Sequence, residues 1–292
     1  MLFRRTWAAA LTTVATLLAL AFTSPAVPAP AAAPAAPGPG LAAPAAPGPG
    51  LLVVDYQPAA TSQDLVEQEF LQENEVLESA AAHANALIGL PADVPLTATS
   101  CDEVNAFWDP ETGSITFCYG LVSAYRGLFG ELNTTGTEAQ QNRATEDDLI
   151  GISNSVVFHE FGHALIDIYE LPSTGREEDA ADQLATLLLA GDSLHQGYAV
   201  SAIEAWGALA RASEQGDLTG QLADEHSLDA QRYYNAICWL YGSDPAVYEG
   251  VVVQTSANPE APLPESRAVR CPDEYDKINR AWSTLLQPYL KT

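Results

Sequence analysis

Two histidines and a glutamate stand at a fixed spacing within an apolar segment of this 292-residue chain, Val156-Val157-Phe158-His159-Glu160-Phe161-Gly162-His163. On a helix, positions i and i+4 lie on one face, so His159 and His163 can direct imidazole nitrogens at a single ion. Glu160 lies beside the first histidine, where a carboxylate can reach a water molecule at that ion and act as a general base. The HExxH spacing therefore predicts a zinc-dependent hydrolytic centre.

The residues around this motif predict a helix that is buried on most sides. Thr145 is a candidate N-cap, and acidic residues follow it in the expected first turn. Gly162 leaves one flank of the helix bare, which suits a neighbouring helix of small residues. The apolar positions that surround the helix are Leu149, Ile150, Ile152, Val156, Val157, Phe158, Phe161, Leu165 and Ile168.

A catalytic zinc ion needs one more protein ligand and one open position for water. A second helix is expected at 176–189, because Thr174 and Glu177 fit a capping box just before it. Glu178 and Asp182 are an i, i+4 pair on one face of that helix. We assign Glu178 as the third ligand and Asp182 as the carboxylate that accepts the far N–H of a ligand histidine.

Two neighbouring acidic residues are rivals of Glu178 for the ligand role. Glu177 and Asp179 stand directly beside it in the sequence. A cluster of this kind near a helix N-terminus is most often a solvated acidic face. The HExxH motif upstream is what favours the ligand interpretation.

The combination of HExxH with Glu178-Asp179-Ala180-Ala181-Asp182 resembles the HExxH plus ExxAD signature of gluzincin metallopeptidases, such as the CAAX prenyl protease and its bacterial stress-induced relatives. Those relatives are membrane proteins, and this chain does not resemble them in that respect. The chain after about residue 60 is also similar to a bacterial family of secreted metallopeptidases. This resemblance implies a zincin fold and adds little about substrate. It rests on 105–108, 118–119, 159–167, 175–183, 224–227 and 238–242.

A peptidase of this kind also needs a donor for the oxyanion that forms when water attacks the carbonyl group. His226 is the first candidate for this catalytic role, with Tyr233 and Tyr234 as alternatives, and a structural histidine is the other interpretation. His83 is expected to be an ordinary helix histidine, and His195 is expected on a surface turn.

Alternating residues predict strands at 51–56, 95–101 and 114–118, with Phe107-Trp108 ahead of the turn that leads into the last of them. We expect an α+β, mainly helical zincin-like domain with a small antiparallel sheet over the active-site helix. In zincins an edge strand can pair with an extended peptide, so 106–108 or 115–118 is expected to line the cleft, with a place in the hydrophobic core as the alternative for these aromatic residues. Helical patterns occur at 62–90, 119–132, 193–213, 221–241 and 273–286.

The chain divides into three parts by composition. Residues 1–26 have the charged, apolar and small-residue regions of a secretory signal peptide, which predicts a secreted protein. Residues 27–50 are rich in Ala, Pro and Gly and predict a disordered linker. Residues 51–292 have the composition of one zincin-like metallopeptidase domain, and the mature chain is expected to have no membrane span.

The four cysteines are an even number in a chain expected to be exported, which predicts disulfides. Proximity in the sequence favours the pairs Cys101–Cys118 and Cys238–Cys271, although three pairings are possible. Zinc binding by cysteine is disfavoured because no close cysteine pair exists. The net charge of −26 argues against nucleic acid as a partner. The sequence gives no oligomeric state.

The favoured hypothesis is a secreted peptidase that binds one Zn²⁺ per chain and cleaves a peptide or protein substrate. A different class of protein also fits the sequence, namely an exported zincin-fold binding module without catalysis. A zinc amidase that acts on a non-peptide or cell-wall amide is a further alternative. Turnover separates the enzymes from the binding module, because a binder retains a peptide without cleaving it.

Overall fold

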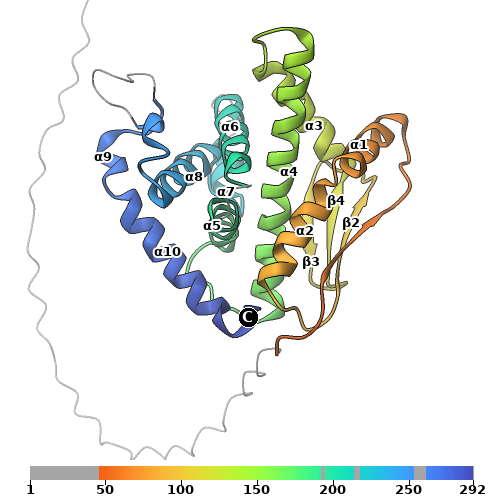
Figure 1. Cartoon of the computed structure of the whole chain (residues 1–292), viewed down its shortest axis with the longest axis horizontal. Coiled ribbons are helices and arrows are strands. Elements are labelled where there is room, and N and C mark those ends of the chain that lie inside the picture. Colours follow the sequence, from red (N-terminus) through yellow and green to blue (C-terminus); the bar gives the residue numbers. More distant parts are fainter. Residues whose placement is uncertain (1–45, 192–194, 214–217, 253–260, 292) are drawn as a thin grey trace, which may run out of the picture. The chain divides into compact units, whose positions relative to one another are not determined.

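A four-stranded sheet and a long helix organise the chain in the computed structural model (Figure 1). The structure describes residues 46–191, 195–213, 218–252 and 261–291. The expected signal peptide and most of the expected linker lie outside these residues. Within the described ranges, none of the helices has the length and apolar character needed to cross a membrane.

The sheet has the strand order β1-β2-β4-β3. Its strands are β1 (Leu52–Tyr56), β2 (Val94–Thr99), β3 (Ala106–Asp109) and β4 (Ser114–Cys118). The α+β, mainly helical class is confirmed, but the expectation of an antiparallel sheet is wrong for two of the three pairings. β1 and β2 are parallel, β2 and β4 are parallel, and only β3 runs antiparallel to its neighbour β4. Two helices connect β1 to β2 and return the chain to the same end of the sheet, and the intervening strand β3 lets β4 run in the same direction as β2.

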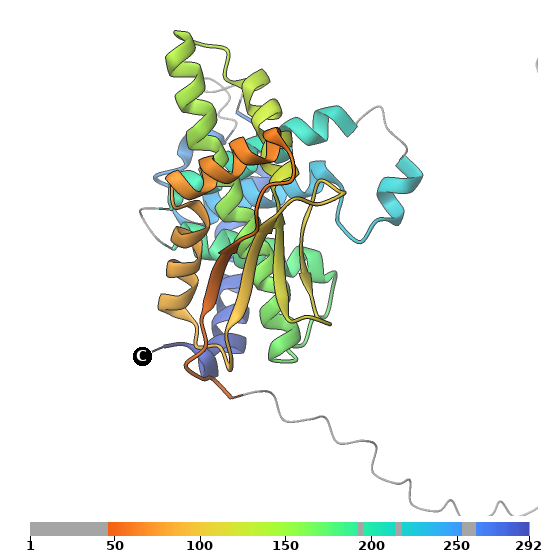
Figure 2. The same cartoon turned by 90° about the vertical axis from the view of Figure 1, so that its right-hand side faces the viewer.

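Helices cover one face of this sheet, as Figure 2 shows. Two of them, α1 (Ser62–Glu73) and α2 (Val76–Leu87), replace the single helix expected at 62–90. The break falls at Glu75, whose φ of 49° is left-handed and cannot continue a helix. The chain can then redirect α2, whose buried alanines pack between β1 and the long helix.

The long helix α4 (Glu138–Ile168) carries the HExxH motif. It begins seven residues before the predicted cap at Thr145, which lies inside the helix and is 7% exposed. The observed N-cap is Thr137, whose hydroxyl accepts from the Gln140 backbone at 3.4 Å, while the Gln140 side chain accepts from the Thr137 backbone at 2.9 Å. Residues 138–144 are mostly good helix formers, so the helix extends back to the N-cap at Thr137.

The C-terminal end of α4 is a Schellman motif. The Leu171 N–H donates to the Ile166 carbonyl at 2.8 Å, and the Glu170 N–H donates to the Asp167 carbonyl at 3.1 Å. Glu170 occupies the left-handed position after the cap with a φ of 49°, where glycine is the usual residue. The residue after the helix end is therefore charged and has a backbone conformation that is unfavourable for any residue with a side chain.

Helix α5 (Glu177–Ala190) packs closely along α4. A Cβ atom added to Gly162 of α4 would lie 3.1 Å from the Cα of Ala181 in α5. The expected pairing of a bare glycine with small residues is therefore present. This close approach brings the acidic face of α5 to the histidines of α4.

The C-terminal half adds helices around α5. These are α6 (Gln196–Ser213), α7 (Leu218–Ala223), α8 (Asp229–Ser243), α9 (Glu265–Ala268) and α10 (Cys271–Leu286), with short 3-10 turns at Glu249–Val251 and Gln287–Tyr289. Both predicted disulfides are confirmed, because Cys101–Cys118 and Cys238–Cys271 are bonded. The second joins the core of α8 to the start of α10.

Candidate metal centre

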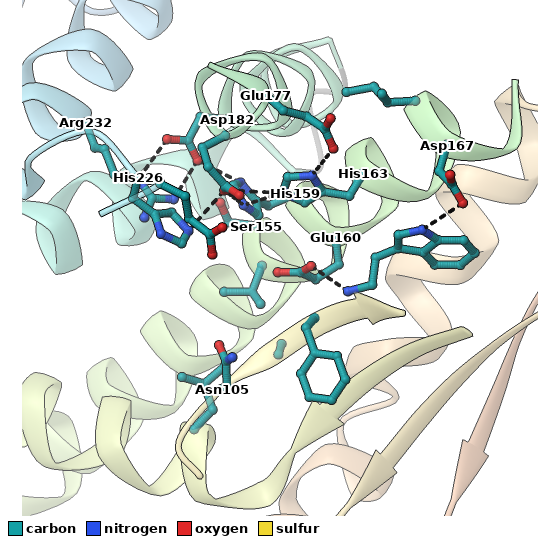
Figure 3. Close-up of a pocket in the computed structure, with 18 of the residues that line it drawn as sticks. Asn105, Ser155, His159, Glu160, His163, Asp167, Glu177, Asp182, His226 and Arg232 are labelled. Atoms are coloured by element: carbon teal, nitrogen blue, oxygen red, sulfur yellow. Dashed lines mark hydrogen bonds and ion pairs between the residues drawn. The ribbon is translucent and has the colours of Figure 1, made fainter. Parts of the chain in front are cut away.

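Three side-chain atoms from α4 and α5 converge on one point in the structure. The Nε2 atoms of His159 and His163 lie 3.2 Å apart, and Glu178 Oε2 lies 3.0 Å from the first and 3.3 Å from the second. Figure 3 shows both imidazoles turned toward the same side of α4. Among the described residues, this is the one group of histidine, cysteine or carboxylate ligands arranged to hold a metal ion.

The spacing and chemistry of these atoms suit a divalent cation. Ligands about 2.0–2.2 Å from a tetrahedral zinc ion lie about 3.3–3.5 Å from one another, close to the observed separations. The outer nitrogens are held by carboxylates, with His159 Nδ1 at 2.8 Å from Asp182 and His163 Nδ1 at 2.8 Å from Glu177. These contacts favour the tautomers that carry a proton on Nδ1, which leaves both Nε2 lone pairs facing inward.

The two rivals of Glu178 are placed elsewhere. Glu177 contacts the outer nitrogen of His163 rather than the inner one. The Asp179 carboxylate accepts a hydrogen bond from Ser227 Oγ at 2.7 Å. The fold therefore sorts three consecutive acidic residues into three different contacts, and only Glu178 faces both inner nitrogens.

The charges of this cluster shift its pKa values strongly. Burial alone would raise the pKa of Glu178, but hydrogen bonds from His159, His163 and His226 outweigh it and lower the pKa far below its usual range. Burial would lower the pKa of His159, but its contacts with Asp182 and Glu178 raise that pKa to about 9. The pKa of His163 is raised in the same way. The carboxylates therefore make the centre strongly attractive to positive charge.

Arg232 holds Asp182 in place and was missed by the sequence reasoning. Its Nε and Nη2 atoms donate to the two Asp182 oxygens at 2.8 and 2.7 Å, and its guanidinium lies 3.6 Å from the ring centroid of Trp206. Burial opposes ionisation of Asp182, yet the arginine charge and the His159 contact lower its pKa well below the usual range. A detectable signal existed, because Arg232 shares one face of its helix with the apolar Trp239 and Leu240.

Glu160 lies on the same helix and lines the adjoining cavity. The backbone N–H of Trp108 in β3 donates to Glu160 Oε2 at 3.0 Å. The indole N–H of Trp108 donates to Asp167, further along α4, at 3.3 Å. Burial raises the pKa of Glu160, and the nearby histidine charges and the Trp108 N–H oppose that rise. Strand β3 therefore orients one carboxylate oxygen of Glu160, a contact that sequence spacing could not reveal.

His226 reaches the centre from the loop before α8. Its Nε2 lies 3.0 Å from Glu178 Oε2, and its Nδ1 lies 3.0 Å from Asp224 Oδ1. The contact with Glu178 is the main reason that the pKa of His226 is raised. Arg176 fixes this loop, because its Nη1 donates to the carbonyls of Asp224, Glu225 and His226 at 2.8–2.9 Å.

The remaining candidates lie apart from the centre. Tyr233 packs against Gly207 in a different cavity, and Tyr234 does not line the cavity at the metal centre. The expectation that His195 lies on a surface turn is wrong, because it is 4% exposed and its ring lies 4.7 Å from that of His83. The aromatic cluster that encloses it could not be read from a polar local sequence.

A cavity of about 720 Å³ adjoins the converging atoms. It is enclosed by β3, α3 (Tyr119–Leu132), α4, α5, α6 and the segment from Glu225 to Arg232. Residues 106–108 line it, whereas the second candidate segment, 115–118, does not. The cavity has room for several residues of an extended chain.

The fold and this site together define a mainly helical α+β protein with an HExxH helix, a carboxylate from the next helix and an edge strand beside them. The chain belongs to the family DUF4344, described as "Putative metallopeptidase", whose profile matches residues 56–286. No curated protein and no solved structure matches the chain. The family confirms the resemblance to metallopeptidases and implies a metal ion.

Proposed function

We propose that this chain is a zinc-dependent peptidase that cleaves peptide bonds with Glu160 as the general base. The observation that carries the proposal is the convergence of His159 Nε2, His163 Nε2 and Glu178 Oε2 beside a cavity that Glu160 also lines. Membership of a metallopeptidase family supports the same reaction class.

The ligands proposed for the ion are His159, His163 and Glu178. Two imidazoles and one carboxylate with an open fourth position form a ligand set typical of catalytic zinc. When bound, zinc lowers the pKa of a water molecule and polarises the substrate carbonyl. Asp182 and Glu177 orient the two imidazoles through their outer nitrogens.

Glu160 takes the proton of the attacking water and later donates it to the leaving amine. One of its oxygens accepts from the Trp108 N–H, so the other is available for the proton. The hydrogen bond also prevents the carboxylate from rotating freely, which lowers the entropy cost of reaching the correct geometry.

His226 is proposed as the donor that stabilises the developing oxyanion. Its Nε2 lies in the same cluster as the ligand atoms, and Asp224 holds the ring through Nδ1. In this role the Nε2 contact with Glu178 has to open, while Asp224 keeps the ring in place through Nδ1. The alternatives Tyr233 and Tyr234 lack this position.

Strand β3 is proposed to bind the substrate backbone. It is an edge strand, paired on one side with β4 and bordering the cavity on the other. The Trp108 N–H points away from β4, and the backbone groups of Ala106, two residues earlier, face the same side. An extended peptide can add to such an edge through main-chain hydrogen bonds.

We also propose that the protein acts outside the cell as a secreted enzyme. Its two disulfides are compatible with an oxidising compartment. A peptide or protein is the proposed partner, and the acidic composition disfavours nucleic acid. Mass spectrometry of the N-terminus of the exported protein would test the cleavage expected after residue 26.

The deciding experiment combines metal content with turnover. Wild-type protein is expected to contain one zinc ion per chain and to cleave peptides in a mixed library. Glu178→Ala is expected to lose the zinc, whereas the matched Asp179→Ala variant is expected to keep it. Glu160→Gln is expected to keep zinc and lose turnover by a factor of about 100 or more.

Each alternative outcome has a clear meaning. Undiminished turnover in Glu160→Gln would remove this residue as the base. Zinc with peptide binding but no cleavage would identify a binding module. Cleavage of cell-wall amides and not of peptides would identify an amidase. No zinc in the wild type after reconstitution would refute the proposed centre.

A further inference from the structure

The cavity at the metal centre has two chemically different ends, and α4 defines them. Asp167 lies about one turn beyond His163 on the face that carries the histidines, and Glu170 lies just past the end of α4 at Ile168. Val156 lies about one turn before His159 on the same face. All three residues outside the motif line the cavity. A substrate that extends through the cavity therefore meets different surroundings on either side of the centre.

The end beyond His163 carries three carboxylates, with the indole of Trp108 beside Asp167. Asp167, Glu170 and Glu177 line it, and all three are exposed to solvent. The one arginine or lysine among the described lining residues is Arg232, whose guanidinium is already bound by Asp182. The carboxylates of Glu160 and Glu178 balance the two positive charges of a bound divalent cation. The three carboxylates at this end therefore keep their net negative charge when the cation is present.

Glu170 has the features of a residue that binds a ligand at this end. Within the described part of the chain, no side chain makes a hydrogen bond to its carboxylate, whereas Asp167 and Glu177 are engaged by Trp108 and His163. Its backbone has the left-handed conformation that favours glycine. Glycine would stabilise this helix end better, so the stability of the fold does not explain why a glutamate occupies the position.

The opposite end is apolar and aromatic. Leu121 and Tyr125 of α3 line it together with Val156 of α4 and Trp206 of α6. Arg232 lies over one face of Trp206, which anchors the indole in position. Such a surface suits a large apolar side chain, since burial of apolar area is favourable and aromatic rings give it shape.

We propose that the cleft selects peptides with a lysine or arginine on one side of the cleaved bond and a large apolar residue on the other. This inference rests on the proposed peptidase function. Asp167 lies four residues beyond His163, about 6 Å along the helix axis, and Glu170 lies just past the helix end at Ile168. An extended peptide covers about 6 Å with two residues and reaches past the helix end with three. The basic residue therefore lies two or three positions from the cleaved bond.

Binding to the zinc-loaded Glu160→Gln protein tests this preference without turnover. The probes are fluorescent peptides that are identical except for Lys, Gln or Glu two or three residues before a bulky residue. The Lys peptide is expected to bind most tightly, with an advantage that falls between 50 and 500 mM salt. Adding Glu170→Gln is expected to reduce the Lys advantage about two- to fivefold. Glu146→Gln, an exposed carboxylate on α4 outside the cavity, is the charge-matched control.

Two further variants test whether the Glu170 charge acts independently of its backbone conformation and whether the apolar end of the cavity selects a large side chain. Glu170→Gly is expected to reduce the Lys advantage as much as Glu170→Gln does, without loss of thermal stability. Leu121→Ala is expected to reduce the preference for Phe over Ala about threefold or more, without changing the Lys advantage. Equal binding of the Lys and Glu peptides, or a Lys advantage that survives Glu170→Gln, would overturn the proposal.

Mapping of wild-type cleavage sites in a peptide library distinguishes the two levels of inference. Cleavage with enriched Lys or Arg on one side and apolar residues on the other is the expected result. Cleavage with neither enrichment would overturn the selectivity and leave the peptidase function intact. No cleavage of any peptide by the zinc-loaded wild type would overturn both.

Discussion

Two arginine–carboxylate pairs in this protein are built alike and lie in different regions. Arg126 donates to Glu67 with Nε at 3.0 Å and Nη2 at 2.7 Å, and Arg232 donates to Asp182 at 2.8 and 2.7 Å. Each guanidinium also lies over an aromatic ring, at 4.8 Å in the first pair and 3.6 Å in the second. A planar, stacked cation therefore neutralises a fully buried carboxylate in the first pair and a half-buried one in the second.

The two carboxylates differ in what else they contact. Glu67 is fully buried and accepts one further hydrogen bond, from Gln63 on its own helix at 3.1 Å. Asp182 accepts from His159 Nδ1 at 2.8 Å and so connects α8 to a proposed metal ligand. The same ion pair therefore fixes helix packing in one region and the orientation of an imidazole in the other. The comparison shows that the hydrogen bond from His159 to Asp182 links the Arg232–Asp182 pair to the site. The ion pair alone would not do so.

The largest expected effect comes from removing each cation. Arg126→Met leaves the Glu67 charge buried with only the Gln63 hydrogen bond and is expected to cost about 3 to 5 kcal/mol of unfolding free energy. Arg232→Met is expected to cost a similar amount and also to weaken zinc binding about tenfold. Urea denaturation of the zinc-free proteins and zinc titration against a competing chelator measure the two quantities. Equal zinc affinity in both folded variants would break the comparison.

Removal of each disulfide tests whether stability and catalysis depend on different regions of the protein. Loss of Cys101–Cys118, with a separation of 17 residues, is expected to cost about 3 kcal/mol, and loss of Cys238–Cys271, with 33 residues, about 4 kcal/mol. The first closes a loop that contains β3, so a double alanine variant is also expected to lower kcat/KM. The second variant is expected to lose stability alone. Denaturation curves and peptide cleavage at low temperature measure both effects.

A milder change acts on the carboxylates. Asp182→Asn removes the charge that orients His159 and is expected to weaken zinc binding about 10- to 100-fold. Glu67→Gln makes the corresponding change in the other region and is expected to leave zinc affinity unchanged. Competition titration compares them directly. A zinc affinity of Asp182→Asn within twofold of the wild type would contradict the orienting role.

The smallest effect concerns Glu170, where fold and site meet in one residue. Glu170→Gly relieves the left-handed backbone and is expected to stabilise the protein by about 0.5 to 1 kcal/mol. Thermal denaturation measures the change, with Glu170→Gln as the control that keeps the strain. A destabilised glycine variant would show that this side chain supports the fold.

Local pattern was sufficient for much of the fold. The helix predicted at 119–132 matches α3 residue for residue, because its boundaries are marked by adjacent strand and polar residues. The start of α4 was misplaced because two threonines both fit an N-cap, and only the loop before the helix decides between them. The predicted strand direction is wrong for β1 and β2, which two helices connect, and for β2 and β4, which are separated by the intervening strand β3.

The candidate site divides in the same way. His159, His163 and Glu160 follow from one helical period, and Glu178 with Asp182 follows from the next helix. Other contacts join residues far apart in the sequence, such as Trp108 to Glu160 and Arg232 to Asp182. Sequence reasoning proposed His226 without being able to place it, and the loop held by Arg176 brings it to Glu178.

The sequence by itself determined the spacing of the histidines and the acidic face of the second helix, and it favoured the two cysteine pairs. These features depend on helix geometry or on proximity along the chain, which the backbone fixes locally. The tertiary structure alone decided which of Glu177, Glu178 and Asp179 faces the inner nitrogens, because helix packing sets the rotation of α5 against α4. It also decided which strand edge borders the cleft, since β3 pairs with β4 on one side and faces the cavity on the other.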